Sequence, residues 1–209
     1  MATSTADQAP KPAKPGDRAP DFELPAADRE GTVALGDFLR RGPVLLALFA
    51  GLYCAFCRRQ ISQIRPACET LRASGIELVG LVIASPSHAR RYFHYRPACF
   101  PIAAAPDRAI HRAYGLPVLE RTPAFREETE RLAVDALREL GLQAPLGQAD
   151  KTFDSWDGFE VTAEDGAESR LPPQSVGYFL IGRDRVIRWS QGGDRVKPLP
   201  KAEELLALV

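Results

Sequence analysis

The stretch from Val44 to Arg65 constrains the fold more than any other part of the sequence. It begins with an unbroken apolar run over 44–50, which has the length and composition of a fully buried strand. Two cysteines in a C-x-x-C spacing, Cys54 and Cys57, come next. Apolar residues then recur at spacings of three and four, which predicts a helix: Ile61, Ile64, Cys68 and Leu71. Two thiols are therefore expected where a buried strand passes into a helix, and Pro66 should kink that helix.

The C-x-x-C spacing predicts a redox-active pair. Residues three apart on a first helical turn lie about 5–6 Å from each other, which is within the separation that a disulfide tolerates. Cys54 falls at the helix start, where unpaired N–H groups and the positive end of the dipole favour a thiolate. Arg58 and Arg59 add positive charge nearby. We therefore expect a lowered pKa and a nucleophilic thiolate at Cys54, with Cys57 as the resolving thiol.

Two other interpretations of the pair carry less weight. A structural zinc site needs four ligands, and the sequence has no second C-x-x-C. The remaining possible ligands have no typical zinc-site spacing: Cys68, Cys99, His88, His94 and His111. Two cysteines could also be small core hydrophobes. The order of strand, C-x-x-C and helix favours redox chemistry over both.

The other cysteines and the histidines are expected to have packing roles. Cys68 lies eleven residues after Cys57, roughly 16 Å along a helix, which is beyond disulfide reach. We therefore expect a core cysteine at 68, and a buried residue rather than a second resolving thiol at Cys99. The histidines fall on predicted helices, where packed or solvent-facing side chains are the default.

Length and composition limit the class of protein. The 209 residues suit one domain over 16–209, preceded by a flexible lead over 1–15 that is rich in Pro, Ala, Lys and Thr. Counts of 27 basic and 27 acidic residues argue against a nucleic-acid partner or an anionic membrane. No apolar run is long enough to span a membrane, and the N-terminus has no signal-like apolar region. Four cysteines in such a chain predict reduced thiols in the cytoplasm, and no metal, flavin or nucleotide site is visible.

The elements around the cysteines predict an α/β sheet. A second apolar strand over 76–83 follows the cysteine helix, which makes a parallel crossover. A helix should begin at Ser85 and run to about Tyr95. Near the end of the chain, 178–181 and 186–189 form a predicted hairpin, and 200–209 a closing helix.

Residues 116–173 differ in character and form a predicted insertion of helix and loop. Thr122 can cap a helix that Gly141 ends. The segment 143–173 is rich in Gly, Asp, Pro and Ser and is expected to be a long loop. Its aromatic residues either pack the insertion onto the core or line a docking surface: Phe153, Trp156 and Phe159.

Most of the chain outside this insertion resembles the redoxin branch of the thioredoxin superfamily, the alkyl hydroperoxide reductase and thiol-specific antioxidant group. The matching motifs are Gly16-Asp17-x-Ala-Pro20-Asp21-Phe22-x-Leu24, Leu35-x-Asp37-Phe38, Cys54-Ala-Phe-Cys57-Arg58, Phe100-Pro101 with Asp107, Ala113-Tyr114-Gly115, and the late hairpin from Gly177 to Arg188. The resemblance implies a thioredoxin-like fold, a central mixed sheet flanked by helices. It also implies that Cys54 stands at the position of the attacking, peroxidatic cysteine.

The sequence departs from the family pattern at three places. Peroxiredoxins carry a Pro-x-x-x-Thr-x-x-Cys motif, and here Ala47 and Gly51 stand at the Pro and Thr positions. Residues 174–177 replace the active-site arginine that precedes the late strand, and Arg58 is a candidate substitute. Gly177 also stands where thioredoxins place a cis-proline. The resemblance is therefore to peroxiredoxin-like redoxins that carry C-x-x-C.

Three functions follow as expectations. The first is antioxidant reduction of hydroperoxides, in which Cys54 attacks and Cys57 resolves, with a thioredoxin- or glutaredoxin-type reductant restoring the thiols. The second is thioredoxin-like exchange with protein disulfides, which the C-x-x-C and the missing Thr favour. The third, from another class, is a non-enzymatic binding module that uses the insertion as its interaction surface.

Overall fold

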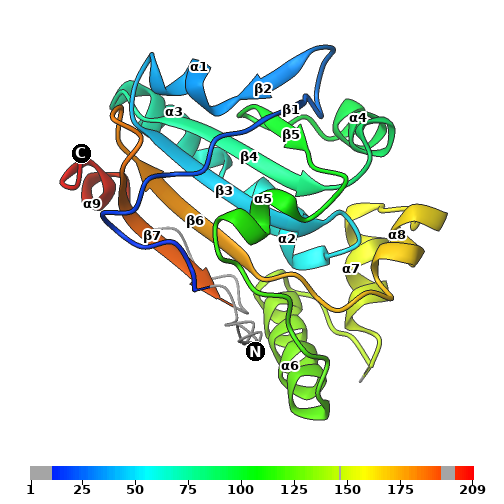
Figure 1. Cartoon of the computed structure of the whole chain (residues 1–209). Helices are drawn as coiled ribbons and strands as arrows, with labels where there is room; N and C mark the ends of the chain where they lie inside the picture. The colour runs from blue at the N-terminus through cyan, green and yellow to red at the C-terminus, as the bar shows by residue number, and fades with distance from the viewer. Residues whose placement is uncertain (1–10, 146, 194–200) are drawn as a thin grey trace, which may run out of the picture.

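The centre of the molecule is a five-stranded mixed sheet in the order β5-β4-β3-β6-β7, seen in a computed structural model that describes residues 11–145, 147–193 and 201–209 (Figure 1). Its strands are β3 (Val44–Gly51), β4 (Glu77–Ile83), β5 (Ile102–Ala104), β6 (Val176–Ile181) and β7 (Ile187–Gly193). β3 runs parallel to β4 and antiparallel to β6. All eight residues of β3 are buried, as expected of an apolar strand with both faces covered. The predicted strand, crossover and late hairpin are confirmed.

Helices cover both faces of this sheet. They are α1 (Leu35–Leu39), α2 (Ala55–Gln63), α3 (Arg65–Ala73), α4 (Pro86–Tyr95), α5 (Ala109–Ala113) and α9 (Ala202–Leu206). Apolar residues of α2, α3, α4 and α9 share one core with the sheet, including Ile61, Leu71 and Leu205. On the opposite face, α1, α5 and the hairpin of β1 (Glu23–Pro25) and β2 (Thr32–Ala34) form a second core. The predicted mixed sheet flanked by helices is confirmed.

The helix after the cysteines is broken, where the sequence predicted one kinked helix. α2 ends at Gln63 and α3 begins at Arg65, with Ile64 between them. Pro66 is the second residue of α3, a position where its missing N–H leaves no helical bond unmade. The proline therefore starts a new helix.

The prediction of a long loop over 143–173 is wrong. After α6 (Pro123–Glu139), which Thr122 caps as expected, the insertion contains α7 (Ala149–Asp157) and α8 (Ala163–Glu168). α7 has no side-chain N-cap and a polar sequence, so its local signals are weak. Its buried Phe153 shows that packing stabilises it, which local patterns do not reveal. Figure 1 shows α6, α7 and α8 gathered beside the start of α2.

The two ends of the described chain pack against the core. The backbone N–H of Ala13 donates to the carbonyl of Tyr114, so residues 11–15 of the predicted lead run beside α5. The rest of that lead lies outside the described residues.

Among the helices that the structure describes, none combines the length and apolar character needed to cross a membrane.

Candidate active site

The two cysteines of the C-x-x-C lie at the junction where the sequence places them. β3 ends at Gly51, and the extended backbone of Cys54 forms the N-cap of α2. Cys54 is half-buried, whereas Cys57 is only 1% exposed. The backbone N–H of Cys57 donates to the Cys54 sulfur at 3.4 Å. A reagent can therefore reach Cys54 first, and Cys57 lies directly behind it.

The surroundings of the pair separate the two pKa values. A hydrogen bond from the Cys57 side chain is the main cause that lowers the Cys54 pKa, and it outweighs burial. The Cys57 N–H and the Arg58 charge lower it further, whereas the Asp150 carboxylate raises it. The same hydrogen bond, together with burial, raises the Cys57 pKa well above its usual range. The expected lowering at Cys54 is thus confirmed, and the geometry favours a thiolate at 54 beside a thiol at 57.

The positive charge near the pair comes from one of the two expected arginines. The guanidinium of Arg59 pairs with Glu139 at 2.7 Å, outside the set of groups that shift the Cys54 pKa. Arg58 is buried and does contribute. Of the expected pair, Arg58 therefore supports the thiolate and Arg59 binds the insertion.

Arg58 is held by two aspartates of α7, by the Leu52 carbonyl and by the ring of Phe159. It donates to Asp154 at 2.5 Å, to Asp157 at 2.7 Å and to the Leu52 carbonyl at 2.8 Å. Its guanidinium also lies over the ring of Phe159, 3.8 Å from the centroid. The Arg58 donors therefore fix the insertion onto the first turn of α2. Because these donors already bind protein oxygens, the geometry does not support Arg58 as a substitute for the family arginine that holds a peroxide.

Sequence reasoning missed Asp154 and Asp157. Their spacing of three, which places both on one face of a helix, was the available signal. The loop interpretation of 143–173 hid it, because a loop has no faces. A small apolar cluster completes the contact between insertion and site: Ala55, Ala133, Ala136, Leu137, Ala149 and Phe153.

The structure shows the surroundings of three positions at which the sequence departs from the related families. A Cβ on Gly51 would stand 2.7 Å from the Tyr53 ring, so a threonine fits only if that ring moves. At the position of the family arginine, the Gln174 amide donates to the Leu116 and Pro117 carbonyls and supplies no charge. No cis peptide occurs in the described part of the chain, Gly177 included.

Cys68 and Cys99 form a disulfide, and the expectation of two independent packing cysteines is wrong. Their Cα atoms are 6.3 Å apart, although 31 residues separate them in the sequence. α3, which carries Cys68, packs beside the segment that precedes β5. Arg65 on α3 holds this segment through the Pro97 carbonyl at 2.8 Å. The expectation that all four cysteines are reduced is corrected with it; Cys54 and Cys57 are free.

The histidines are packed or solvent-facing, as expected. The His88 ring pairs with Asp165 at 3.0 Å, and the His111 ring with the Phe49 carbonyl at 2.9 Å, both buried. His94 is exposed on α4. Across 11–145, 147–193 and 201–209 no cluster of three or more metal-ligating residues occurs, so the zinc interpretation has no support there.

A family model and curated proteins are similar to part of this chain. The family model described as the AhpC/TSA family matches residues 15–134. "Putative peroxiredoxin Rv2521" of Mycobacterium tuberculosis (strain ATCC 25618 / H37Rv) is 29% identical over 101 residues, 48% of this chain and 63% of that protein. The chain thus matches less than two thirds of the length of this curated relative.

Solved structures extend the likeness to nearly the whole chain. The crystal structure of peroxidoxin BcpB from Mycobacterium tuberculosis aligns with a TM-score of 0.58 at 14% identity, over 94% of this chain and 96% of that one. The reduced 2-Cys peroxiredoxin of Plasmodium vivax gives 0.57 at 14% identity, over 93% of both chains. These likenesses confirm the thioredoxin-like fold. Because the family model matches more than half of the sequence, the protein belongs to the AhpC/TSA family.

Proposed function

We propose that the protein is a thiol peroxidase in which Cys54 attacks a hydroperoxide and Cys57 resolves the product. One observation carries this proposal: the two thiols differ in access and in charge. Cys54 is half-buried with a lowered pKa, and Cys57 is buried with a raised one. Nucleophile and resolving thiol require this division, because the thiolate is the reactive form.

The reaction takes two steps. The Cys54 thiolate attacks the distal peroxide oxygen, the O–O bond breaks, and the released alkoxide takes a proton to leave a sulfenic acid on Cys54. The Cys57 sulfur then attacks the Cys54 sulfur, the S–O bond breaks, and the departing hydroxyl takes up the Cys57 proton and leaves as water. A thioredoxin- or glutaredoxin-type dithiol would supply the two electrons that reopen the Cys54–Cys57 disulfide.

Rapid quench with one equivalent of hydrogen peroxide tests the mechanism. Mass spectrometry of the wild-type protein should find closure between Cys54 and Cys57, and Cys57→Ser should stop at a sulfenic acid that dimedone traps. Cys54→Ser should consume no peroxide. Peroxide consumption at the wild-type rate by Cys54→Ser would refute the assignment.

Exchange with protein disulfides is the second candidate, and two features of the site favour it. Position 51 offers no hydroxyl, and the donors of Arg58 are taken by α7 and Leu52. A peroxide therefore lacks two hydrogen-bond donors, whereas attack on a disulfide sulfur needs only the thiolate. Slow closure with peroxide and fast closure with a disulfide-bonded protein substrate would select this candidate.

The binding-module alternative predicts that neither oxidant closes the pair. The insertion contacts Ala55 and Arg58, the residues next to the two cysteines. It therefore forms part of the environment of the thiols and is not only an outer surface. A reactive Cys54 would therefore count against a purely non-enzymatic role. The cytoplasmic location stays a prediction that cell fractionation would test.

A further inference from the structure

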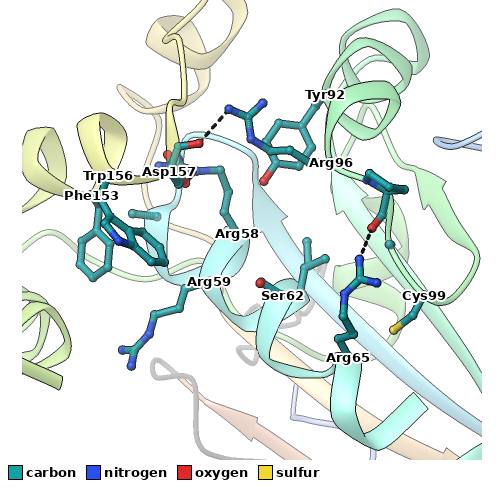
Figure 2. A pocket seen from close by; sticks show the side chains of 14 residues that line it. Arg58, Arg59, Ser62, Arg65, Tyr92, Arg96, Cys99, Phe153, Trp156 and Asp157 are labelled. Carbon is teal, nitrogen blue, oxygen red and sulfur yellow. Dashed lines mark hydrogen bonds and ion pairs between the residues drawn. The ribbon is translucent and has the colours of Figure 1, made fainter. Parts of the chain in front are cut away.

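A pocket lined in part by Cys99 lies beside the first turns of α2. Ala55 and Arg58, next to the C-x-x-C, line it, but Cys54 and Cys57 do not. It has a volume of about 280 Å³ and lies between α2, the end of α4, the segment before β5, and α7 (Figure 2). Among the residues that line it are Cys99, Arg65, Arg96 and Trp156. The sulfur in this wall belongs to the Cys68–Cys99 disulfide.

The two sulfurs of this disulfide differ in access. Cys99 is half-buried and lines the pocket, whereas Cys68, on the core side of α3, is 4% exposed. An attacking thiolate from the pocket would therefore meet the Cys99 sulfur. Cys68 would be the leaving thiolate.

Four arginines and one acidic residue, Asp157, line the pocket, and two of the arginines make no ion pair among the described residues. Arg65 donates to the Pro97 carbonyl, and Arg96 donates to the carbonyls of Asp157 and Gly158. Neither guanidinium has a carboxylate partner within the described residues. The other two arginines of the lining are paired, Arg58 with Asp154 and Asp157, and Arg59 with Glu139. Figure 2 shows Arg65 on the side where Cys99 lies and Arg96 above it.

We propose that this pocket binds a low-molecular-mass thiol that carries carboxylates, and that this thiol reduces the Cys68–Cys99 disulfide. The volume suits a small molecule, close to the lower limit of ligand pockets. Two unpaired guanidiniums provide the recognition of carboxylates. Trp156 is 49% exposed and supplies an apolar wall opposite them.

The exchange balances with two equivalents of the thiol. The first thiolate attacks the Cys99 sulfur, the S–S bond breaks, and the Cys68 thiolate leaves and takes a proton. A second thiolate attacks the sulfur of the bound thiol in this mixed disulfide. It releases the small-molecule disulfide and a Cys99 thiolate that is then protonated. Two small thiols are oxidised and one protein disulfide is reduced.

The test uses the full chain with Cys54→Ser and Cys57→Ser, so that the remaining disulfide is followed alone. Its failure would therefore leave the peroxidase proposal untouched. The probes are glutathione, which carries two carboxylates, 2-mercaptoethanol, which carries none, and cysteamine, which is cationic. Rates are compared at equal thiolate concentration by alkylation and mass spectrometry of Cys99.

The expected result is a preference of roughly tenfold for glutathione over 2-mercaptoethanol, as charged clefts produce, and a rate below both for cysteamine. Added salt should reduce the preference. Arg65→Gln and Arg96→Gln should each lower it, Arg65→Lys should retain most of it, and Arg40→Gln, on a distant exposed arginine, should leave it unchanged. The 2-mercaptoethanol rate of each variant corrects for any change in folding or access.

Three results would overturn the proposal. Equal rates for the three thiols would show that the pocket recognises no carboxylate. A glutathione preference that survives both glutamine variants would place recognition elsewhere. Reduction by thioredoxin alone would assign the disulfide to a protein partner.

Discussion

At the scale of single residues, the charge on Cys54 depends on a few neighbouring groups. The Cys57 side chain and the Arg58 guanidinium lower its pKa, and the Asp150 carboxylate on α7 raises it. Asp150 itself has a raised pKa, mainly because of its desolvation and then because of the nearby Asp154. The insertion therefore acts on the thiolate in both directions, through Asp150 directly and through the aspartates that hold Arg58.

Neutralising Asp150 should make Cys54 a stronger acid. In Asp150→Asn the opposing negative charge is lost, so the Cys54 pKa should fall below its wild-type value. The pH dependence of iodoacetamide alkylation, read by mass spectrometry at Cys54, would measure the shift. Asp135→Asn, an exposed site on α6, is the control and should change nothing. A pKa that rises in Asp150→Asn would contradict the prediction.

His111 should make stability depend on pH. Burial lowers the pKa of this side chain to about 4 from an ordinary value of 6.5. The unfolded chain therefore binds a proton that the folded chain excludes between about pH 6.5 and 4, so stability is present above this window and is lost as pH falls through it. The difference amounts to about 3 kcal/mol.

Urea unfolding at pH 7 and at pH 4 would measure this term. Between pH 7 and pH 4, His111→Gln should lose about 3 kcal/mol less of its free energy of unfolding than the wild-type protein loses. Its free energy of unfolding at pH 7 should already be lower, because the substitution changes the packing. His94→Gln, on an exposed histidine, should keep the wild-type dependence. Equal pH dependence in His111→Gln and the wild-type protein would refute this role.

At the scale of secondary-structure elements, α7 is attached to α2 by a buried charge network. Arg58 in this network has a side chain that is 1% exposed, and its partners Asp154 and Asp157 are 23% and 19% exposed. Removing one partner of such a network leaves charges buried and unpaired. The neighbouring Arg59 pairs with a largely exposed Glu139, so it offers a matched comparison.

Arg58→Met should lower the free energy of unfolding by about 3–5 kcal/mol, the usual cost of breaking a buried pair. Arg59→Met should cost less, about 1 kcal/mol, because its partner Glu139 is 70% exposed and stays solvated when the pair is broken, although the Arg59 side chain is 13% exposed. Urea unfolding of both variants measures the difference, and hydrogen exchange should show faster exchange in α7 of Arg58→Met only. Similar costs for the two variants would show that α7 is held by other contacts.

The elements could be predicted from the sequence where local patterns decide them. β3 and β4 were found because their apolar runs are continuous, and α6 because Thr122 caps it. α7 could not be found in this way, because its stability comes from Phe153 and from the aspartates that meet Arg58. The same distinction holds for the site: Cys54 and Cys57 follow from spacing, whereas the Cys68–Cys99 disulfide depends on how α3 meets a distant segment.

At the scale of the whole molecule, this disulfide joins two parts of the fold across 31 residues. Loop closure of this length predicts a stabilisation of about 3–4 kcal/mol, chiefly through the unfolded chain. In the Cys54→Ser, Cys57→Ser background, reduction should therefore lower the urea midpoint and raise the slope, because the unfolded chain without the cross-link is less compact. Adding Cys68→Ser and Cys99→Ser to that background should lower the midpoint in the same way and make it insensitive to reductant. A midpoint that reductant leaves unchanged in the disulfide-containing background would contradict the prediction.

The strand order also has a consequence for synthesis on the ribosome. β3 ends at residue 51, but its neighbour β6 begins at residue 176, so the centre of the sheet closes only after β3, β4 and β5 have been made. At 5–20 residues per second, β3 waits roughly 6–25 s for this neighbour. All four cysteines emerge before β6 does. The nascent chain thus presents its thiols to oxidants and chaperones while one edge of β3, its most apolar strand, is still unpaired. The cysteines can therefore form disulfides before the sheet is complete.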